Sequence, residues 1–221
     1  MEYQCPEPAD LANVEALNRG FLYWLREHQQ DLTPRSENAK QLGARLARLD
    51  DGTVARLARV PFLLMSLDEH DDRRWRQVFA AEPYADLFDT QHRRGEIETR
   101  LTLAMLGFLW QLARRNPYTA RLVSGATLEW CDHLAALSLV ALYAQVGRCS
   151  PLQPRLSGDA GFWNKLLGGG TSGRREVRLA ARVSAMQVVI ADSAMSMPRQ
   201  LPAAACNMPA VPIRVAARRR S

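Results

Sequence analysis

Apolar residues recur at intervals of three and four along most of this 221-residue chain, and this period constrains the fold more than any other feature. The longest stretch of this kind runs from Glu96 to about Arg115. Its apolar side chains would cover most of a helical circumference: Ile97, Leu101, Ala104, Met105, Phe108, Leu109 and Leu112. A helix that is apolar on most sides is surrounded by other helices. We therefore expect this helix in the middle of the fold.

Caps and helix breakers indicate the remaining elements of an all-α fold. Seven further helices are expected: from Asp10 to about Gln30, from a Ser36 cap, from a Thr53 cap, after the acidic run DEHDD, from about Pro117, from Thr127 to Val146, and from about Arg174 to Ala191. The apolar run FLLMSL is predicted to be a helical turn or a short buried strand. No segment shows two alternating strands joined by a hairpin turn. The prediction is an all-α helical bundle of about eight helices, in one or two lobes.

The same pattern divides the chain into five parts. The last part contains four prolines and no helical or strand period, which is typical of disorder. The predicted parts are a loose N-terminus (1–9), an N-terminal helical lobe with a helix-turn-helix-like hairpin (10–80), a connection (81–95), a C-terminal helical lobe (96–192) and a disordered basic tail (193–221).

The positive charge of the chain is concentrated at its C-terminal end. The formal net charge is +6, and the last eight residues hold four arginines and no acid. The rest of the chain therefore carries only +2. This balance permits a nucleic acid, an anionic membrane surface or an acidic protein as a partner, but it requires none of them.

Three further observations exclude classes of protein. The longest apolar stretches have thirteen residues, whereas a helix that spans a bilayer needs about 20. The first ten residues do not form a signal peptide. No two of the four cysteines lie within four residues of each other, so no zinc-ribbon or thioredoxin-type pair is present. We expect a cytoplasmic protein with reduced thiols, no membrane span, no metal and no cofactor.

The stretch QLGARLARLDDGTVARLARVPFLL, residues 41–64, has the general form of a helix-turn-helix. In that interpretation the second helix begins near Thr53, and Arg56 and Arg59 point outward to DNA phosphates. Asp50 and Asp51 argue against it, because they place negative charge where phosphates would approach. The alternative is an ordinary helical hairpin in the core.

The N-terminal third resembles a known family. The order LNRGFLYWLREHQ, QLGARLARLDDGTVARLARVPFLLMSL, DEHDD and RRWRQVF is similar to the D subunit of the flagellar master transcriptional activator. The similarity covers about residues 11–80 and leaves the segment from Glu96 onward unexplained. It implies a helical protein that dimerises and acts with a second subunit to activate flagellar operons. It also implies that residues 53–59 contact DNA or a partner.

Two stretches are candidates for other chemistry. Glu129 and His133 are four residues apart on one predicted helix, so they could act as an orienting group and a base. The alternative is a polar pair in the bundle without a catalytic role. The run DEHDD offers possible metal ligands, but a solvated helix N-terminus with Asp71 or Asp72 as its cap is the simpler interpretation.

The sequence thus predicts a bacterial regulatory protein without catalytic residues. It would be associated with transcription and bind DNA through residues 41–60, with Thr53, Arg56 and Arg59 at the contact. The alternative is a helical adaptor or chaperone that holds another protein. A protein partner is expected in either case, as a homodimer or a hetero-oligomer.

Overall fold

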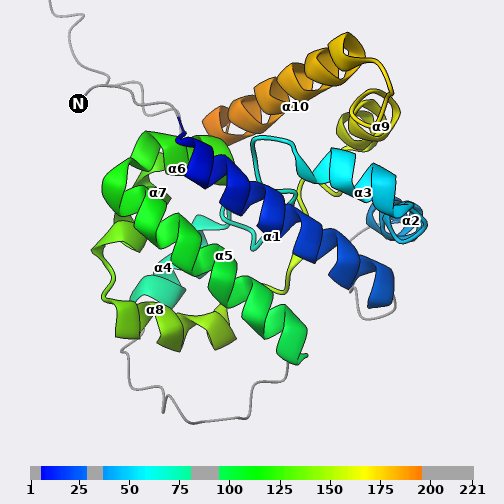
Figure 1. The fold of residues 1–221 in the computed structure, drawn as a ribbon. Coiled ribbons are helices and arrows are strands. Elements are labelled where there is room, and N and C mark those ends of the chain that lie inside the picture. Colours follow the sequence, from blue (N-terminus) through cyan, green and yellow to red (C-terminus); the bar gives the residue numbers. More distant parts are fainter. Residues whose placement is uncertain (1–5, 29–36, 81–94, 196–221) are drawn as a thin grey trace, which may run out of the picture.

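The computed structural model describes residues 6–28, 37–80 and 95–195 (Figure 1). Within these ranges the chain forms ten α-helices: α1 (Pro8–Glu27), α2 (Glu37–Leu46), α3 (Asp51–Ala58), α4 (Asp72–Ala80), α5 (Glu96–Arg115), α6 (Pro117–Ser124), α7 (Leu128–Ala136), α8 (Leu139–Gln145), α9 (Ala160–Gly169) and α10 (Arg175–Met195). A 3₁₀ turn and two short strands accompany them: η1 (Val146–Arg148), β1 (Met65–Ser66) and β2 (Gln153–Pro154). The predicted all-α helical bundle is confirmed.

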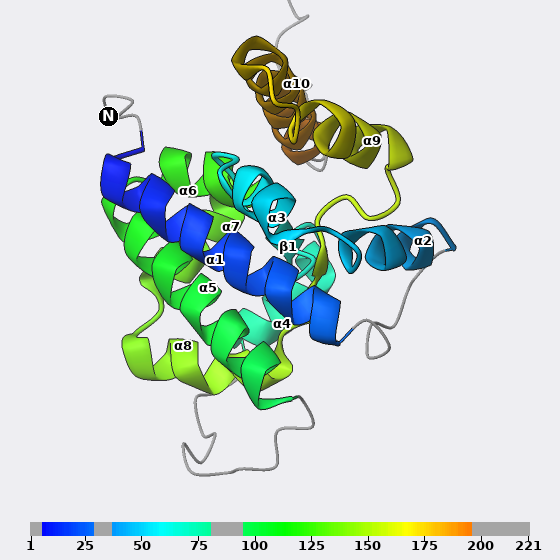
Figure 2. The same ribbon diagram turned by 45° about the vertical axis from the view of Figure 1, so that its right-hand side comes forward.

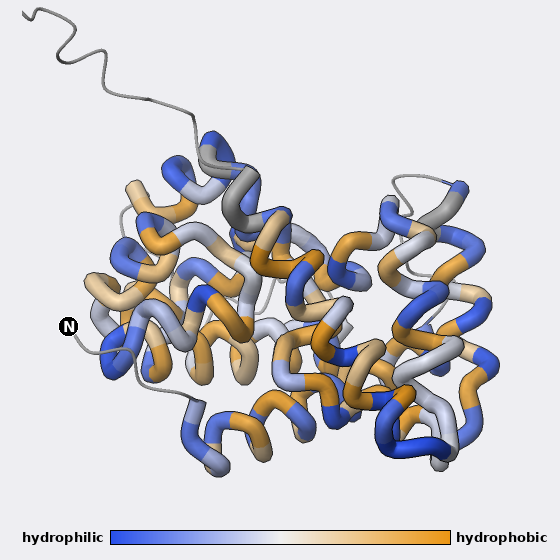
Figure 3. Tube along the Cα trace, turned by 90° about the horizontal axis from the view of Figure 1, so that it is seen from above, coloured by the Kyte–Doolittle hydropathy of each residue, from blue (hydrophilic) through white to orange (hydrophobic). Residues whose placement is uncertain are grey.

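Helix α5 lies in the middle of the bundle, as its sequence predicts. It contacts α1, α6, α7 and α8, and it runs beside α1 in Figures 1 and 2. Met105, Leu109 and Leu112 are buried on it, but Ile97 near its N-terminus is 45% exposed. Figure 3 shows apolar and polar positions alternating along the helices, which is the pattern of amphipathic helices.

The helices before and after residue 90 share one hydrophobic core. Helix α1 connects the two halves, because it packs against α3 on one side and against α5 on the other. The division into lobes of residues 10–80 and 96–192 stays a prediction. The connection predicted for 81–95 lies outside the described residues, apart from residue 95.

The ends of three elements differ from the prediction. Helix α1 begins at Pro8, so residues 8 and 9 are not loose. Helix α3 is capped by Asp50 and not by Thr53, because the Asp50 carboxylate accepts a hydrogen bond from the Thr53 amide (2.9 Å). Helix α10 continues to Met195, so residues 193–195 are helical. The rest of the tail predicted to be disordered, 196–221, lies outside the described residues, as do residues 1–5 of the predicted loose N-terminus.

The helix predicted from Thr127 to Val146 is in fact two helices. Thr127 caps α7 by accepting a hydrogen bond from the Trp130 amide, as expected. The backbone of Leu137 is extended and ends α7. The Ser138 hydroxyl then caps α8 through the amide of Ala141. A second cap, Ser138, lies inside this apolar stretch and therefore divides it into two helices.

The apolar run FLLMSL contains a short buried strand, one of its two predicted forms. Met65 and Ser66 pair antiparallel with Pro154 and Gln153, about ninety positions further along the chain. Because the segment 62–67 is buried and not helical, its backbone groups need partners from other segments. The Asn18 side chain on α1 supplies two of them, since it donates to the Phe62 carbonyl (2.9 Å) and accepts from the Leu64 amide (2.7 Å).

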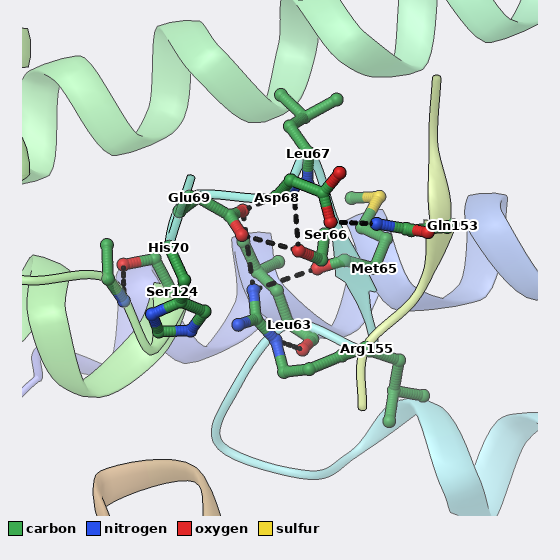
Figure 4. A network of polar contacts seen from close by, with 12 residues as sticks. Leu63, Met65, Ser66, Leu67, Asp68, Glu69, His70, Ser124, Gln153 and Arg155 are labelled. Atoms are coloured by element: carbon green, nitrogen blue, oxygen red, sulfur yellow. Dashed lines mark hydrogen bonds and ion pairs between the residues drawn. The ribbon is translucent and has the colours of Figure 1, made fainter. Parts of the chain in front are cut away.

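Arg155 supplies further partners from the β2 side (Figure 4). Its side chain is 3% exposed. Its Nε donates to the Leu63 carbonyl (2.8 Å) and its Nη2 donates to the Met65 carbonyl (2.9 Å). The same Nη2 lies 3.5 Å from Oε1 of Glu69, whose side chain is fully buried. The other carboxylate oxygen of Glu69, Oε2, accepts a hydrogen bond from the Ser66 hydroxyl (2.5 Å). We call Arg155, Glu69, Ser66 and the carbonyls that they bind the Arg155 network.

The Arg155 network touches the turn on which α10 rests. Gly125 ends α6 in the left-handed conformation (φ 68°). A Cβ atom at this position would lie 2.8 Å from Nη1 of Arg155 and 3.0 Å from Cγ1 of Val189 on α10. Glycine is therefore required both by the backbone and by the close approach of two side chains. His70 Nε2 also lies 3.3 Å from the Asp192 carboxylate of α10.

Replacing Arg155 tests whether this network holds the fold together. Arg155→Met leaves the Glu69 carboxylate buried without its cation, so the free energy of unfolding should fall by about 3–5 kcal/mol. Urea unfolding followed by circular dichroism measures the loss. The matched control is Arg100→Gln, which removes an exposed pair with Glu96 and should change stability by less than about 1 kcal/mol. Equal losses in the two variants would contradict this role of Arg155.

Candidate docking surface beside helix α10

Helix α10 is long but only loosely buried. It has 21 residues and packs mainly against α9, with which it forms a pair at one side of the bundle (Figure 2). Among its described side chains only Ala185 and Val189 are buried. The other described side chains of this helix are therefore exposed or half-buried.

A stripe of apolar side chains runs along the open side of α10. Leu179, Val183, Met186 and Ile190 are spaced by four, three and four residues, so they share one face of the helix. Leu179 is 61% exposed, Val183 50% and Ile190 37%, while Met186 is half-buried. We call these four residues the α10 stripe. Contiguous exposed apolar surface of this kind marks interaction sites in soluble proteins.

A groove with a volume of about 520 Å³ adjoins the stripe. Its walls come from three segments: the first half of α1, the turn at residues 59–61 and α10 itself. Leu11 and Ala12 contribute to the first wall, and Val60 and Pro61 to the second. We call this space the α10 groove. It is a concave, mostly apolar surface that continues directly into the stripe.

Arginines surround this apolar surface. Arg59 and Arg182 line the groove, and Glu15 is the one acid among the described residues that line it. Glu15 is already shared, because its Oε1 lies 2.6 Å from Nη2 of Arg19 and 3.4 Å from Nε of Arg59. One carboxylate therefore faces three guanidinium groups, and these four side chains together carry a net positive charge.

Arg182 is the least neutralised of these cations. Its Nη2 donates to the carbonyl of Arg56 (3.2 Å), whereas its Nε is buried without a hydrogen-bond partner. Burial lowers the pKa of the Arg182 guanidinium, and the charges of Arg178 and Arg59 lower it further. Arginine stays protonated at neutral pH in any case. An incoming anion would relieve this excess of positive charge.

The structure places one of the three predicted contact residues, Arg59, in the wall of the groove. Arg59 is exposed and lines the groove, and the carbonyl of Arg56 binds Arg182. Thr53 is half-buried and its hydroxyl is engaged, since it donates to Asp50 (2.6 Å) and accepts from Arg56 (3.0 Å).

The first turn of α3 is acidic. Hydrogen bonds from Thr53 hold the pKa of the Asp50 carboxyl below its usual value, so this group is ionised at neutral pH. Asp51 is exposed and pairs with Arg26 (2.5 Å). Two carboxylates therefore stand at the end of α3 that a recognition helix would present to a DNA groove.

The stretch proposed as enzyme-like has a different arrangement. Glu129 and His133 are both exposed on α7, and no hydrogen bond joins them in the described part of the chain. The His133 ring instead lies 5.5 Å from the ring of Phe79, centroid to centroid. Cys131 between them is buried, which raises the pKa of its thiol to about 12. That thiol stays protonated at neutral pH and is a poor nucleophile.

The acidic run DEHDD forms a helix N-terminus. Asp71 caps α4, because its carboxylate accepts from the Arg74 amide (3.0 Å). The Asp68 carboxylate accepts a hydrogen bond from Gln153, whereas His70 faces Asp192. Across residues 6–28, 37–80 and 95–195 no group of three or more histidine, cysteine or acidic side chains converges as a metal site.

The α10 stripe was not among the residues singled out from the sequence, although its signal is present there. The spacing of Leu179, Val183, Met186 and Ile190 is visible in the printed sequence. Their exposure is not, because an amphipathic helix predicts only which face is apolar and not whether anything covers it. The clustering of Arg182 with Arg56 also depends on contacts across 126 positions.

Comparison with protein families, curated proteins and solved structures finds no match to this chain. The resemblance of residues 11–80 to the flagellar activator subunit therefore stays a prediction. None of the helices in the described ranges combines the length and the hydropathy needed to cross a bilayer.

Proposed function

We propose that this chain is a cytoplasmic, non-enzymatic regulatory module that acts by binding another protein, with the α10 stripe and the α10 groove as its docking surface. The observation that carries this proposal is the exposure of Leu179, Val183 and Ile190 on one face of a long helix. Covering apolar surface stabilises a complex by about 25 cal/mol per Å² before the costs of association. A regulator that works with a second subunit, as the resemblance implies, needs such a surface.

A second apolar patch provides an internal comparison. Leu139 and Val140 on α8 are 49% and 55% exposed. Helix α8 has only seven residues, about two turns, whereas the α10 stripe extends over about three turns and adjoins a groove. The α10 surface is therefore the better seat for a partner, and α8 offers a matched control.

Introducing negative charge on the α10 stripe tests this proposal. Leu179→Glu/Val183→Glu should abolish recovery of the partner when the tagged full-length chain is purified from its own cells, a loss of at least about tenfold. Both positions are exposed, so thermal unfolding by circular dichroism should be nearly unchanged. The control variant Leu139→Glu/Val140→Glu should retain the partner. If the α10 variant keeps the partner while the α8 variant loses it, the docking surface has been assigned to the wrong helix.

DNA binding by a transcription regulator is the second candidate function. The arginines around the α10 groove favour it, because Arg59 and Arg182 line it and the backbone of Arg56 contacts Arg182. The ionised carboxylates of Asp50 and Asp51 oppose it, and so does the engaged hydroxyl of Thr53. An apolar stripe is also not what phosphate contacts require. These observations rank DNA behind a protein partner.

Fluorescence anisotropy with a labelled duplex of random sequence measures this second candidate. For this measurement, the four arginines at 214 and 218–220 of the full chain are replaced by glutamine, so that the tail does not contribute to binding. Our account predicts no salt-sensitive binding. Binding that weakens steeply with salt, and that is lost in Arg56→Gln/Arg59→Gln, would instead assign the surface to DNA.

A further inference from the structure

The chemistry around the α10 stripe identifies the kind of segment that would cover it, provided that the proposed docking surface is correct. The stripe alternates intervals of four and three residues, which is the spacing at which one helix packs along another. From Leu179 to Ile190 it extends over roughly 17 Å at 1.5 Å per residue. A single partner helix of about three turns matches this length.

Most of the charges beside the stripe are positive, although Glu176, three residues before Leu179, lies at its other edge. Arg182 stands between the stripe and the body of the protein, Arg175 lies two turns before it along the same edge, and Arg59 faces them across the groove. Glu15, which lines the groove, is shared between Arg19 and Arg59. Positions that flank an apolar seam select the partner through charge pairs. Arginine forks bind carboxylates through two parallel hydrogen bonds.

We propose that the α10 surface binds an acidic amphipathic helix, whose apolar side chains pack on Leu179, Val183 and Met186 and whose carboxylates pair with Arg182 and Arg59. Arg182 lines the groove, and among the described residues it binds a backbone carbonyl and pairs with no acidic side chain, so such a carboxylate would neutralise its charge. Arg182 is then the residue that sets the charge preference of the site.

Charge complementarity disfavours other occupants. The C-terminal segment of this chain carries Arg214 and three consecutive arginines, so it has the same sign as the groove. A second copy would bring Arg175, Arg178 and Arg182 of its own α10 toward the same cations. An acidic helix neutralises the arginines while it covers the apolar stripe.

Two synthetic peptides of about 18 residues test the proposal. Both have leucine at the four-three spacing; one carries glutamate at the flanking positions and the other lysine. Fluorescence anisotropy with the full chain should show the glutamate peptide binding at least about tenfold more tightly at low salt. The preference should shrink at high salt, because exposed charges are screened.

Variants of the chain localise the effect. Arg182→Gln should weaken binding of the glutamate peptide about tenfold, and Arg59→Gln, at an exposed position, should weaken it without any risk to folding. Arg100→Gln on α5 is the control with the same charge change and should have no effect. Leu179→Glu/Val183→Glu should abolish binding of both peptides.

The outcomes separate this inference from the proposed function. Equal affinity for the two peptides, lost in the Leu179→Glu/Val183→Glu variant, would overturn the acidic helix and leave the docking surface standing. Self-association of the chain through the stripe, seen by sedimentation velocity, would replace the acidic helix with a second copy. Failure of the glutamate peptide to bind would overturn the inference. If the stripe variant also retained its cellular partner, the proposed function would fail with it.

Discussion

The buried hydrogen bonds of Arg155 are the interaction on which the rest of the structure depends. The segment 62–67 runs through the core without being helical, and Arg155 satisfies its carbonyls from the far side while Glu69 balances the charge. The guanidinium also abuts Gly125, and the same glycine receives Val189 of α10. The Arg155 network therefore fixes α10 near Val189, in the second half of the helix. The shape of the groove around Leu179, in the first half, depends on this attachment.

This arrangement explains why α10 is attached at one end and open along one face. Ala185 and Val189 anchor its second half, and α9 covers another side. The stripe from Leu179 to Ile190 lies on a different face, and its first three residues line the groove. A helix fixed in this way keeps its apolar residues in a defined position without burying them. Such a preorganised surface loses little conformational entropy when a partner helix binds.

Local patterns predicted most of the fold. The period of three and four residues placed α1, α5 and α10, and the Thr127 and Asp71 caps were also predictable, because each depends on residues within one turn. The Arg155 network was not predictable, because it joins residues about ninety positions apart. For the candidate site, the sequence drew attention to Arg59 only as a possible DNA contact, whereas Arg182 and the open stripe depend on how α10 packs.

Hydrogen exchange measured by mass spectrometry on the full chain, with and without the glutamate-flanked helical peptide, tests the central claim most directly. The account predicts slower exchange in α10 between residues 179 and 190, in the first half of α1 and at residues 59–61, because these segments form the stripe and the groove. Exchange in α8 should not change. Protection confined to α8, or to the first turn of α3, would contradict the account.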